Sequence, residues 1–413
     1  MAAQGSASPR RAAFGFILVN VWLDVLALGV IIPVLPPLIQ AFSHGDAGRA
    51  SLAIGLFGAV FSLVQFFAAP VLGALSDHFG RRPVLLISLF GLACDYLLMA
   101  LAPSLGWLFV GRVISGVTAA TGATAGAYIA DTTDPDKRAR VFGWMGSAWG
   151  LGFIIGPALG GWIGAFGVRL PFFGAAAMTL VGALYGLVVL PESLPKARRS
   201  PFAWIRANPV GSLTLLRSHP ELWGLSGVNF LMQLAHNVLP TTFVLYASNR
   251  YGWSPAFTGS ALALTGICNI VVQSLLVGPV VARIGERGAV LAGLVSGGLG
   301  FAIYGLAPTG PLFLLGTPVF AFIGLFGPGY QALISRHVSP SEQGRLRGAN
   351  ASIDSTAGII GPALFGATYA WFVGGHGIVA PGAAFLLAAL LHVAASALAV
   401  PVMRRGHAAA AAE

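Results

Sequence analysis

The chain has 413 residues, of which 56% are hydrophobic and only 9% are charged, whereas about 25% of the residues of an ordinary soluble domain are charged. A soluble domain of this length has no means of burying so much apolar surface, so the composition excludes that class and indicates a protein embedded in a lipid bilayer. A formal net charge of +10 is typical of proteins that bind nucleic acid. Here the positions of the basic residues indicate membrane topology instead, so we expect no nucleic-acid binding.

A membrane span needs about 20 mainly apolar residues, and twelve such segments follow one another along the chain. The first one is too long for the apolar part of a cleaved signal peptide, so we expect an uncleaved first helix. We therefore predict an all-α membrane protein. Its predicted spans are 14–36, 51–75, 84–101, 107–130, 140–165, 171–190, 220–247, 257–282, 289–307, 311–333, 348–372 and 381–403.

The lysines and arginines gather on one side of these spans. If the N-terminus is cytoplasmic, nineteen of them lie on the cytoplasmic side, and only Arg49, Arg169 and Arg250 lie on the other. Arg112 falls inside a span. Because an excess of Lys and Arg marks cytoplasmic loops, this distribution predicts an even number of spans with both termini in the cytoplasm.

The two halves of the chain resemble each other. A shift of 205 residues carries Gly80 onto Gly285 and the dipeptide Gly156-Pro157 onto Gly361-Pro362. We predict an N-terminal six-helix bundle at 1–190, a cytoplasmic linker at 191–219 and a C-terminal six-helix bundle at 220–413. Two pseudo-symmetric bundles around a central cavity are a known architecture of secondary transporters.

Two motifs in the first half indicate moving parts. The loop after the second span reads Gly73-Ala-Leu-Ser-Asp77-His78-Phe-Gly80-Arg81-Arg82-Pro83. A carboxylate that contacts an arginine or a helix N-terminus, and loses that contact when two bundles rock, forms a gate; the alternative is a solvated loop whose arginines only set topology. Small residues and a proline in the fifth span predict close packing and a bend. The predicted gate comprises Gly73, Asp77, Gly80, Arg81, Arg82, Gly152, Gly156 and Pro157.

These motifs resemble those of the major facilitator superfamily, namely its loop signature GxxxDRxGRRP and its Gly-Pro antiporter motif. Within that superfamily the chain is similar to the tetracycline/proton antiporters. The matching stretches include Leu23-Asp24, Cys94-Asp95-Tyr96, Gly111-Arg112 and Tyr128-Ile-Ala-Asp131. The resemblance implies the major facilitator fold, with twelve helices in two six-helix bundles. It also implies proton-driven export of a small amphiphilic drug across the inner (plasma) membrane, without a cofactor or metal, and we expect a functional monomer.

The second half departs from the antiporter pattern. The resemblance implies an aspartate in the ninth span and, in several members, a histidine in the eighth, but the alignment places Gly297 and Asn269 there. His78 also stands where the loop signature has an arginine. These differences leave open whether tetracycline itself is a substrate and which residue replaces the missing acid.

Five ionisable side chains fall inside predicted spans, namely Asp24, Asp95, Arg112, His236 and Asp354. Each costs at least ~2.5 kcal/mol near mid-depth, so each needs a partner, a cavity or a task. The depths of Asp95 and Arg112 agree, which predicts a contact serving structure or substrate orientation, whereas Asp24 is a proton carrier or a structural hydrogen-bonding group. His236 either replaces the missing acid or lines the pore. Asp354 joins the site or only complements its helix N-terminus.

Uncharged polar residues inside the spans are candidates for the cavity wall. Asn229, Gln233 and Asn237 recur with His236 at helical spacing and predict one polar stripe. The full set is Gln65, Asn229, Gln233, Asn237, Asn269, Gln273 and Gln331. The alternative to drug export is proton-coupled transport of a nutrient, siderophore or endogenous metabolite. Hydrolase and nucleotide-binding motifs are absent from the sequence, and no loop is long enough for an active-site domain, so we expect no enzyme.

Overall fold

The computed structural model describes residues 9–118, 121–202, 215–216, 219, 222–339, 342–374 and 378–410, and every regular element in that part of the chain is helical. Nine helical stretches among these residues are long and apolar enough to cross a membrane. The chain divides by its contacts into two compact units. The first unit comprises Met1–Leu35 and Val64–Asn208, and the second comprises Pro36–Leu63 and Pro209–Glu413.

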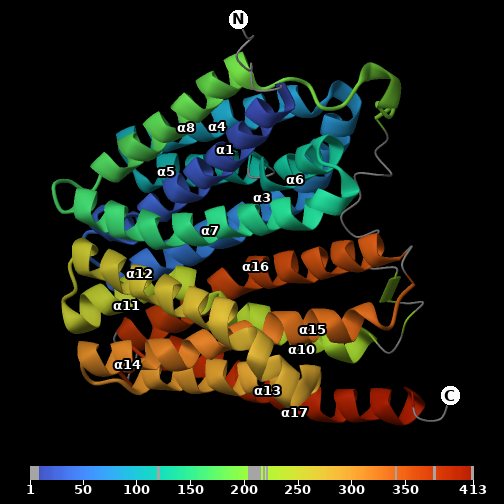
Figure 1. Ribbon diagram of the computed structural model, residues 1–413. Coiled ribbons are helices and arrows are strands. Elements are labelled where there is room, and N and C mark those ends of the chain that lie inside the picture. The colour runs from blue at the N-terminus through green and yellow to red at the C-terminus, as the bar shows by residue number, and fades with distance from the viewer. Residues whose placement is uncertain are drawn as a thin grey trace, which may run out of the picture. The chain divides into compact units, whose positions relative to one another are not determined.

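The first unit is built on a small apolar core. Buried side chains such as Ile17, Tyr128 and Val141 meet there. Its elements (Figure 1) are α1 (Pro9–Ile31), the second part of α3 (Ala47–Phe79), α4 (Arg81–Leu101), α5 (Leu105–Thr118), α6 (Thr121–Thr132), α7 (Pro135–Gly164), α8 (Leu170–Val189) and the short 3₁₀ helix η1 (Lys196–Arg198).

The second unit has a larger core, in which Leu225, Leu294, Phe326 and Ala395 are among the buried side chains. Helices α13 and α17 run along each other in it (Figure 1). Its elements are α2 (Leu35–Phe42), the first part of α3, α10 (Leu222–His236), α11 (Val238–Tyr251), α12 (Pro255–Val271), the π-helical η4 (Val272–Leu276), α13 (Val277–Leu306), α14 (Gly310–Ala321), the 3₁₀ helix η5 (Phe322–Leu325), α15 (Phe326–Ser335), α16 (Gln343–Val373) and α17 (Ala383–Ala410).

Each of the twelve predicted spans is mostly helical where the structure describes it, although residues 32–34 between α1 and α2 form a turn, and residues 119–120 and 220–221 lie outside the described part. Some spans are interrupted: α10 and α11 meet at Asn237, and η5 separates α14 from α15. The stretch Pro255–Leu306 is 52 residues long, which is more than two spans of about 20 residues. It turns at Gly285, whose backbone is not helical. This pattern is consistent with twelve spans.

Gly80 and Gly285 support the duplication of the two halves. Gly80 precedes α4 with φ +109°, and Gly285 has φ +72°. A positive φ in this range is disfavoured for residues with a Cβ atom and is readily adopted by glycine. The two positions are related by the shift of 205 residues, so the same turn recurs at the same place in both halves.

Close helix packing is the structural role of the Gly-Pro motif. In the first unit Gly29 of α1 faces α7, where a Cβ atom added to Gly29 would lie 2.9 Å from Pro157 Cδ. In the second unit α3 packs against Pro362 of α16, which is the counterpart of Pro157. A Cβ atom added to Gly58 of α3 would lie 2.8 Å from Pro362 Cβ. Contacts this close require glycine and let apolar helices associate without a hydrophobic driving force.

The predicted domain boundaries at 190 and 220 stay a prediction. The described start of the predicted linker contains η1, while residues 203–214 and 217–218 of that linker lie outside the described residues. Residues 36–63, which we assigned to the N-terminal bundle, belong by their contacts to the second unit, with Ser51 Oγ donating to Gly366 O at 3.0 Å.

Replacing Gly285 by alanine is expected to destabilise the protein by about 1–2 kcal/mol, because a left-handed backbone is strained for any L-residue with a Cβ atom. Thermal unfolding in detergent, followed by circular dichroism, measures the change. Gly278→Ala is the matched control, since Gly278 lies in the same helix with open space around it and alanine favours helices over glycine. Equal melting temperatures for the two variants would contradict the prediction.

Candidate functional site

A carboxylate is fully buried in the first unit. Asp95 of α4 has no exposed surface, and its Oδ2 lies 3.7 Å from Nη2 of Arg112 on α5. Ser115 Oγ donates to the same oxygen, while Arg112 Nη2 donates to Ser115 Oγ at 3.2 Å. The structure thus brings together the two residues whose matching depths predicted a contact, and their role in transport stays a prediction.

The second oxygen of Asp95 is differently placed. Oδ1 is buried and accepts no hydrogen bond from the described residues. Gly111 faces it, and a Cβ atom there would lie 2.7 Å from Oδ1. A buried acceptor that lacks a donor is costly, so this oxygen is suited to take a proton or a donor group of a ligand.

Asp24 lies close to this cluster in the first unit. Tyr96 of α4 is 3% exposed and lies within electrostatic range of both Asp24 and Asp95. Among the described residues no hydrogen bond or ion pair of the Asp24 carboxylate is seen. Asp24 therefore retains the two roles that the sequence left open. The sequence analysis did not single out Tyr96, although its place directly after an in-span acid was a usable signal.

In the second unit the in-span carboxylate of Asp354 accepts hydrogen bonds from side-chain amides. Asn229 Nδ2 of α10 donates to Asp354 Oδ1 of α16 at 2.8 Å, and the side chain of Gln233 donates to the same carboxylate. Helix α16 begins at Gln343, three turns before Asp354. The field of a helix terminus acts only within the first turn, so the prediction that Asp354 complements the helix N-terminus is wrong.

The side chains of the predicted polar stripe on the seventh span contact two different helices. Asn237 Nδ2 donates to Gln233 O at 2.8 Å and to Ala357 O of α16 at 3.4 Å, so the amides turn toward α16. The ring of His236 instead stacks on Phe320 of α14, with centroids 5.9 Å apart. His236 stays accessible.

The other predicted cavity residues are not brought together by the contacts of the described chain. Asn269 Nδ2 donates to Thr265 O of its own helix at 3.0 Å. Gln273 and Gln331 are exposed, and Gln65 is half-buried. A central cavity lined by these residues stays a prediction.

His392 is an in-span ionisable residue that the sequence analysis missed. It lies on α17 with 1% of its surface exposed, and its Nδ1 is 3.0 Å from Ala388 O. Its ring fills the space beside Gly297 of α13, where a Cβ atom would lie 2.7 Å from His392 Nε2. The signal was available, because a histidine inside the predicted span 381–403 is costly and needs a task.

The predicted gate loop is held by a network of ion pairs. Arg81 Nη1 lies 2.5 Å from Asp77 Oδ1, and Arg81 Nε lies 3.1 Å from Asp131 Oδ2 at the end of α6. Glu192 accepts hydrogen bonds from the backbone amides of Arg81 at 2.8 Å and Arg82 at 3.3 Å. The carboxylate of Glu192 therefore caps the start of α4 and ties it to the segment after α8.

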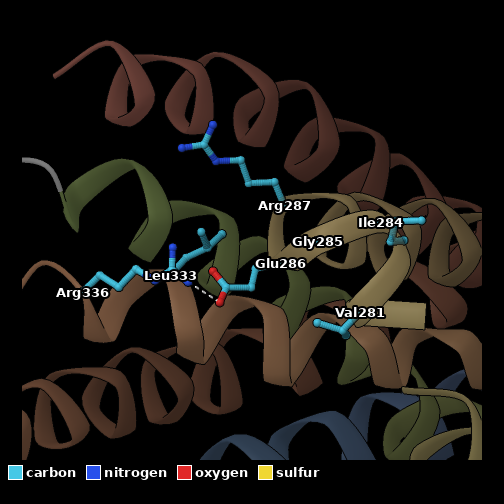
Figure 2. Close-up of a pocket in the computed structure, with 7 residues that line it drawn as sticks. All are labelled: Val281, Ile284, Gly285, Glu286, Arg287, Leu333 and Arg336. Carbon is cyan, nitrogen blue, oxygen red and sulfur yellow. Dashed lines mark hydrogen bonds and ion pairs between the residues drawn. The ribbon is translucent and has the colours of Figure 1, made fainter. Parts of the chain in front are cut away.

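The counterpart of this loop in the second unit borders a pocket of about 530 Å³. Figure 2 shows Glu286 and Arg336 pointing toward each other across it, 2.5 Å apart, while Arg287 points elsewhere. Its lining residues are Val281, Ile284, Gly285, Glu286, Arg287, Leu333 and Arg336. Both halves thus pair an acid with an arginine beside the positive-φ glycine.

Comparison with known proteins agrees with this arrangement. A profile of the Major Facilitator Superfamily matches residues 17–362 and 225–412. The class C tetracycline resistance protein of Escherichia coli is 38% identical over 390 residues, which are 94% of this chain and 96% of that protein. The class G protein of Vibrio anguillarum is 37% identical over 395 residues, again 94% and 96%. The crystal structure of the human organic anion transporter MFSD10, with 24% identity and a TM-score of 0.69 over 95% of this chain and 99% of that one, shares the fold.

Removing Arg112 is expected to destabilise the first unit strongly. Arg112→Gln leaves the buried Asp95 without its cation, which costs about 3–5 kcal/mol when one partner of a buried pair is removed. Adding Asp95→Asn to Arg112→Gln is expected to restore part of the loss, because the uncompensated charge is then gone. Thermal unfolding in detergent measures both variants.

The matched control is Lys137→Gln, which breaks the exposed pair of Lys137 and Asp134 and is expected to cost less than about 1 kcal/mol. Asp95→Asn alone completes the comparison: if the double variant loses as much stability as Arg112→Gln and Asp95→Asn lose together, Asp95 and Arg112 do not act as a pair.

Proposed function

Because the chain belongs to the major facilitator superfamily, we propose that it exports a small amphiphilic drug, tetracycline-like or another antibiotic, in exchange for protons. The superfamily consists of transporters, not enzymes, and this chain is a multi-pass membrane protein. The observation that carries the proposal is the similarity to tetracycline resistance proteins over 94% of the chain. Asp24 and Asp95 both lie within residues 17–362, which the superfamily profile matches.

The first unit supplies the chemistry that proton exchange needs. The pair of Asp95 and Arg112 holds one charge in place and leaves Asp95 Oδ1 free to accept a donor. Asp24, by contrast, forms no ion pair with the described residues, so its carboxylate is the better proton carrier. In this mechanism Asp24 exchanges the proton, and Asp95 with Arg112 orients the substrate.

The membrane and topology follow from the charge distribution. We place the protein in the inner (plasma) membrane with both termini in the cytoplasm, because the cytoplasmic loops carry nearly all the lysines and arginines. The gate loops around Asp77 and Glu286 then face the cytoplasm. We propose that a monomer suffices, since each unit contains its own gate and its own buried ionisable groups.

The identity of the substrate is a separate matter. Gly297 stands where the resemblance implies an aspartate, so a substrate other than tetracycline is favoured for this chain. A nutrient, siderophore or endogenous metabolite is the second candidate on the same observation.

Expression of the chain in a bacterium that lacks its own major drug exporters is expected to raise the minimal inhibitory concentration of at least one amphiphilic drug. The panel contains tetracycline, chloramphenicol, ethidium and a quinolone, and energised cells are also tested for reduced drug accumulation. If resistance and accumulation are unchanged for the whole panel while the protein is present in the membrane, the drug-export proposal is wrong and metabolite transport is favoured.

Asp24→Asn is expected to abolish drug-driven proton movement, because the amide of asparagine does not take up or release a proton. Inverted membrane vesicles with a pH-sensitive dye report the proton flux, and binding of the same drug is measured separately and is expected to persist. The control is Asp46→Asn, which alters an exposed acid paired with Arg49. Full coupling in Asp24→Asn vesicles would refute its role as proton carrier.

A further inference from the structure

The hydrogen bond of His392 determines which of its ring nitrogens is basic. Nδ1 lies 3.0 Å from the carbonyl oxygen of Ala388, one turn earlier in α17. A carbonyl oxygen only accepts hydrogen bonds, so Nδ1 carries the hydrogen. In the neutral ring Nε2 therefore holds a free lone pair. Nε2 is buried and has no hydrogen-bond partner among the described residues.

Among the residues that the structure describes, no acid forms an ion pair with the ring of His392. Helix α13 presents Gly297, Gly298 and Phe301 to the ring, and none of them titrates. From α10, His236 is the ionisable group that interacts electrostatically with His392. Helices α16 and α11 also pack against α17, and an ionisable group of each is bound elsewhere.

On α16, Asp354 is bound by the amides of Asn229 and Gln233. On α11, the hydroxyl of Tyr246 donates to Tyr304 O. A protonated His392 in this arrangement would thus be a buried cation with no acceptor for its second N–H and a second histidine nearby. Because such a cation is strongly disfavoured, the close packing of α13 on α17 is compatible with the neutral ring only.

We propose that Nε2 of His392 is the proton-accepting atom of the second unit in the transport cycle. The lone pair of Nε2 takes up one proton from water on one side of the membrane when α13 withdraws from α17, and it returns that proton to water on the other side before the two helices close again. Nδ1–H stays on the Ala388 carbonyl throughout, so only one bond to hydrogen forms and breaks. This inference rests on the proposed proton-coupled transport.

Gly297 is the structural complement of His392. Any side chain at that position would collide with the imidazole. The absence of a side chain at Gly297 on α13 therefore makes room for the titratable ring on α17. His236 lies at the other end of a row of rings formed by Phe320 and Phe301. Since like charges nearby oppose double protonation, the two histidines are expected to hold one proton between them.

The test separates proton coupling from substrate handling. The full chain is reconstituted in liposomes with radiolabelled tetracycline or ethidium as the probe, chosen as the one that the wild type transports. Uptake driven by a pH gradient and probe-for-probe exchange at equal pH are measured for the wild type, His392→Gln and His392→Asn. We expect gradient-driven uptake to fall roughly tenfold or more in the variants, since neither amide transfers a proton, while exchange persists with a flattened pH profile.

The matched control is His337→Gln. His337 makes the same bond to the carbonyl one turn earlier, with Nδ1 2.9 Å from Leu333 O, but it lies in the turn after α15. Its gradient-driven uptake is expected to equal that of the wild type.

Each other outcome has a defined meaning. Gradient-driven uptake in both His392 variants that matches the wild type, with an unchanged pH profile, would overturn the assignment of His392. Loss of exchange together with uptake in both variants would mark a structural role and would also overturn it. Absence of gradient-driven uptake of either probe in the wild type would instead remove the proposed proton-coupled export of these probes.

Discussion

The cost of placing an ionisable group in a medium without water governs the interior of this protein. A charge in such a place needs a partner or a function, and the two units meet this requirement in different ways. The first unit pairs Asp95 with Arg112 and a serine hydroxyl. The second surrounds Asp354 with neutral amide donors from α10. Buried atoms that have no hydrogen-bond partner among the described residues, such as Nε2 of His392, are the candidate sites for binding a proton.

The internal duplication preserved the scaffold and not the chemistry. The positive-φ glycines Gly80 and Gly285 and the two Gly-Pro dipeptides keep their places in both halves. The ionisable groups do not: the first unit has acids on α1 and α4, whereas the second has an acid on α16 and histidines on α10 and α17. Backbone turns and close helix contacts tolerate few substitutions, whereas the in-span ionisable groups of the two halves lie on different helices.

The predicted gate loop is linked to the segment that follows α8. Glu192 caps the first backbone amides of α4, and Ser200 N donates to Asp77 O at 3.1 Å. Arg81 meanwhile bridges Asp77 and Asp131. A displacement of the loop therefore has to break contacts with the segment after α8 as well as its own ion pairs. If the loop is a gate, as predicted, several hydrogen bonds and ion pairs are lost together when it moves, which favours discrete states.

The sequence alone determined the membrane class, the positions of the twelve predicted spans, the repeat and most of the costly residues, because bilayer thickness and the cost of buried charge act on each segment independently. It also anticipated the contact between Asp95 and Arg112 from their depths. Only the tertiary structure showed that Asp354 meets Asn229, that His236 turns away from the amides beside it, and that His392 fills the space at Gly297. These contacts join helices distant in sequence, and they depend on how each helix is rotated against its neighbours, which the composition of a single span does not specify.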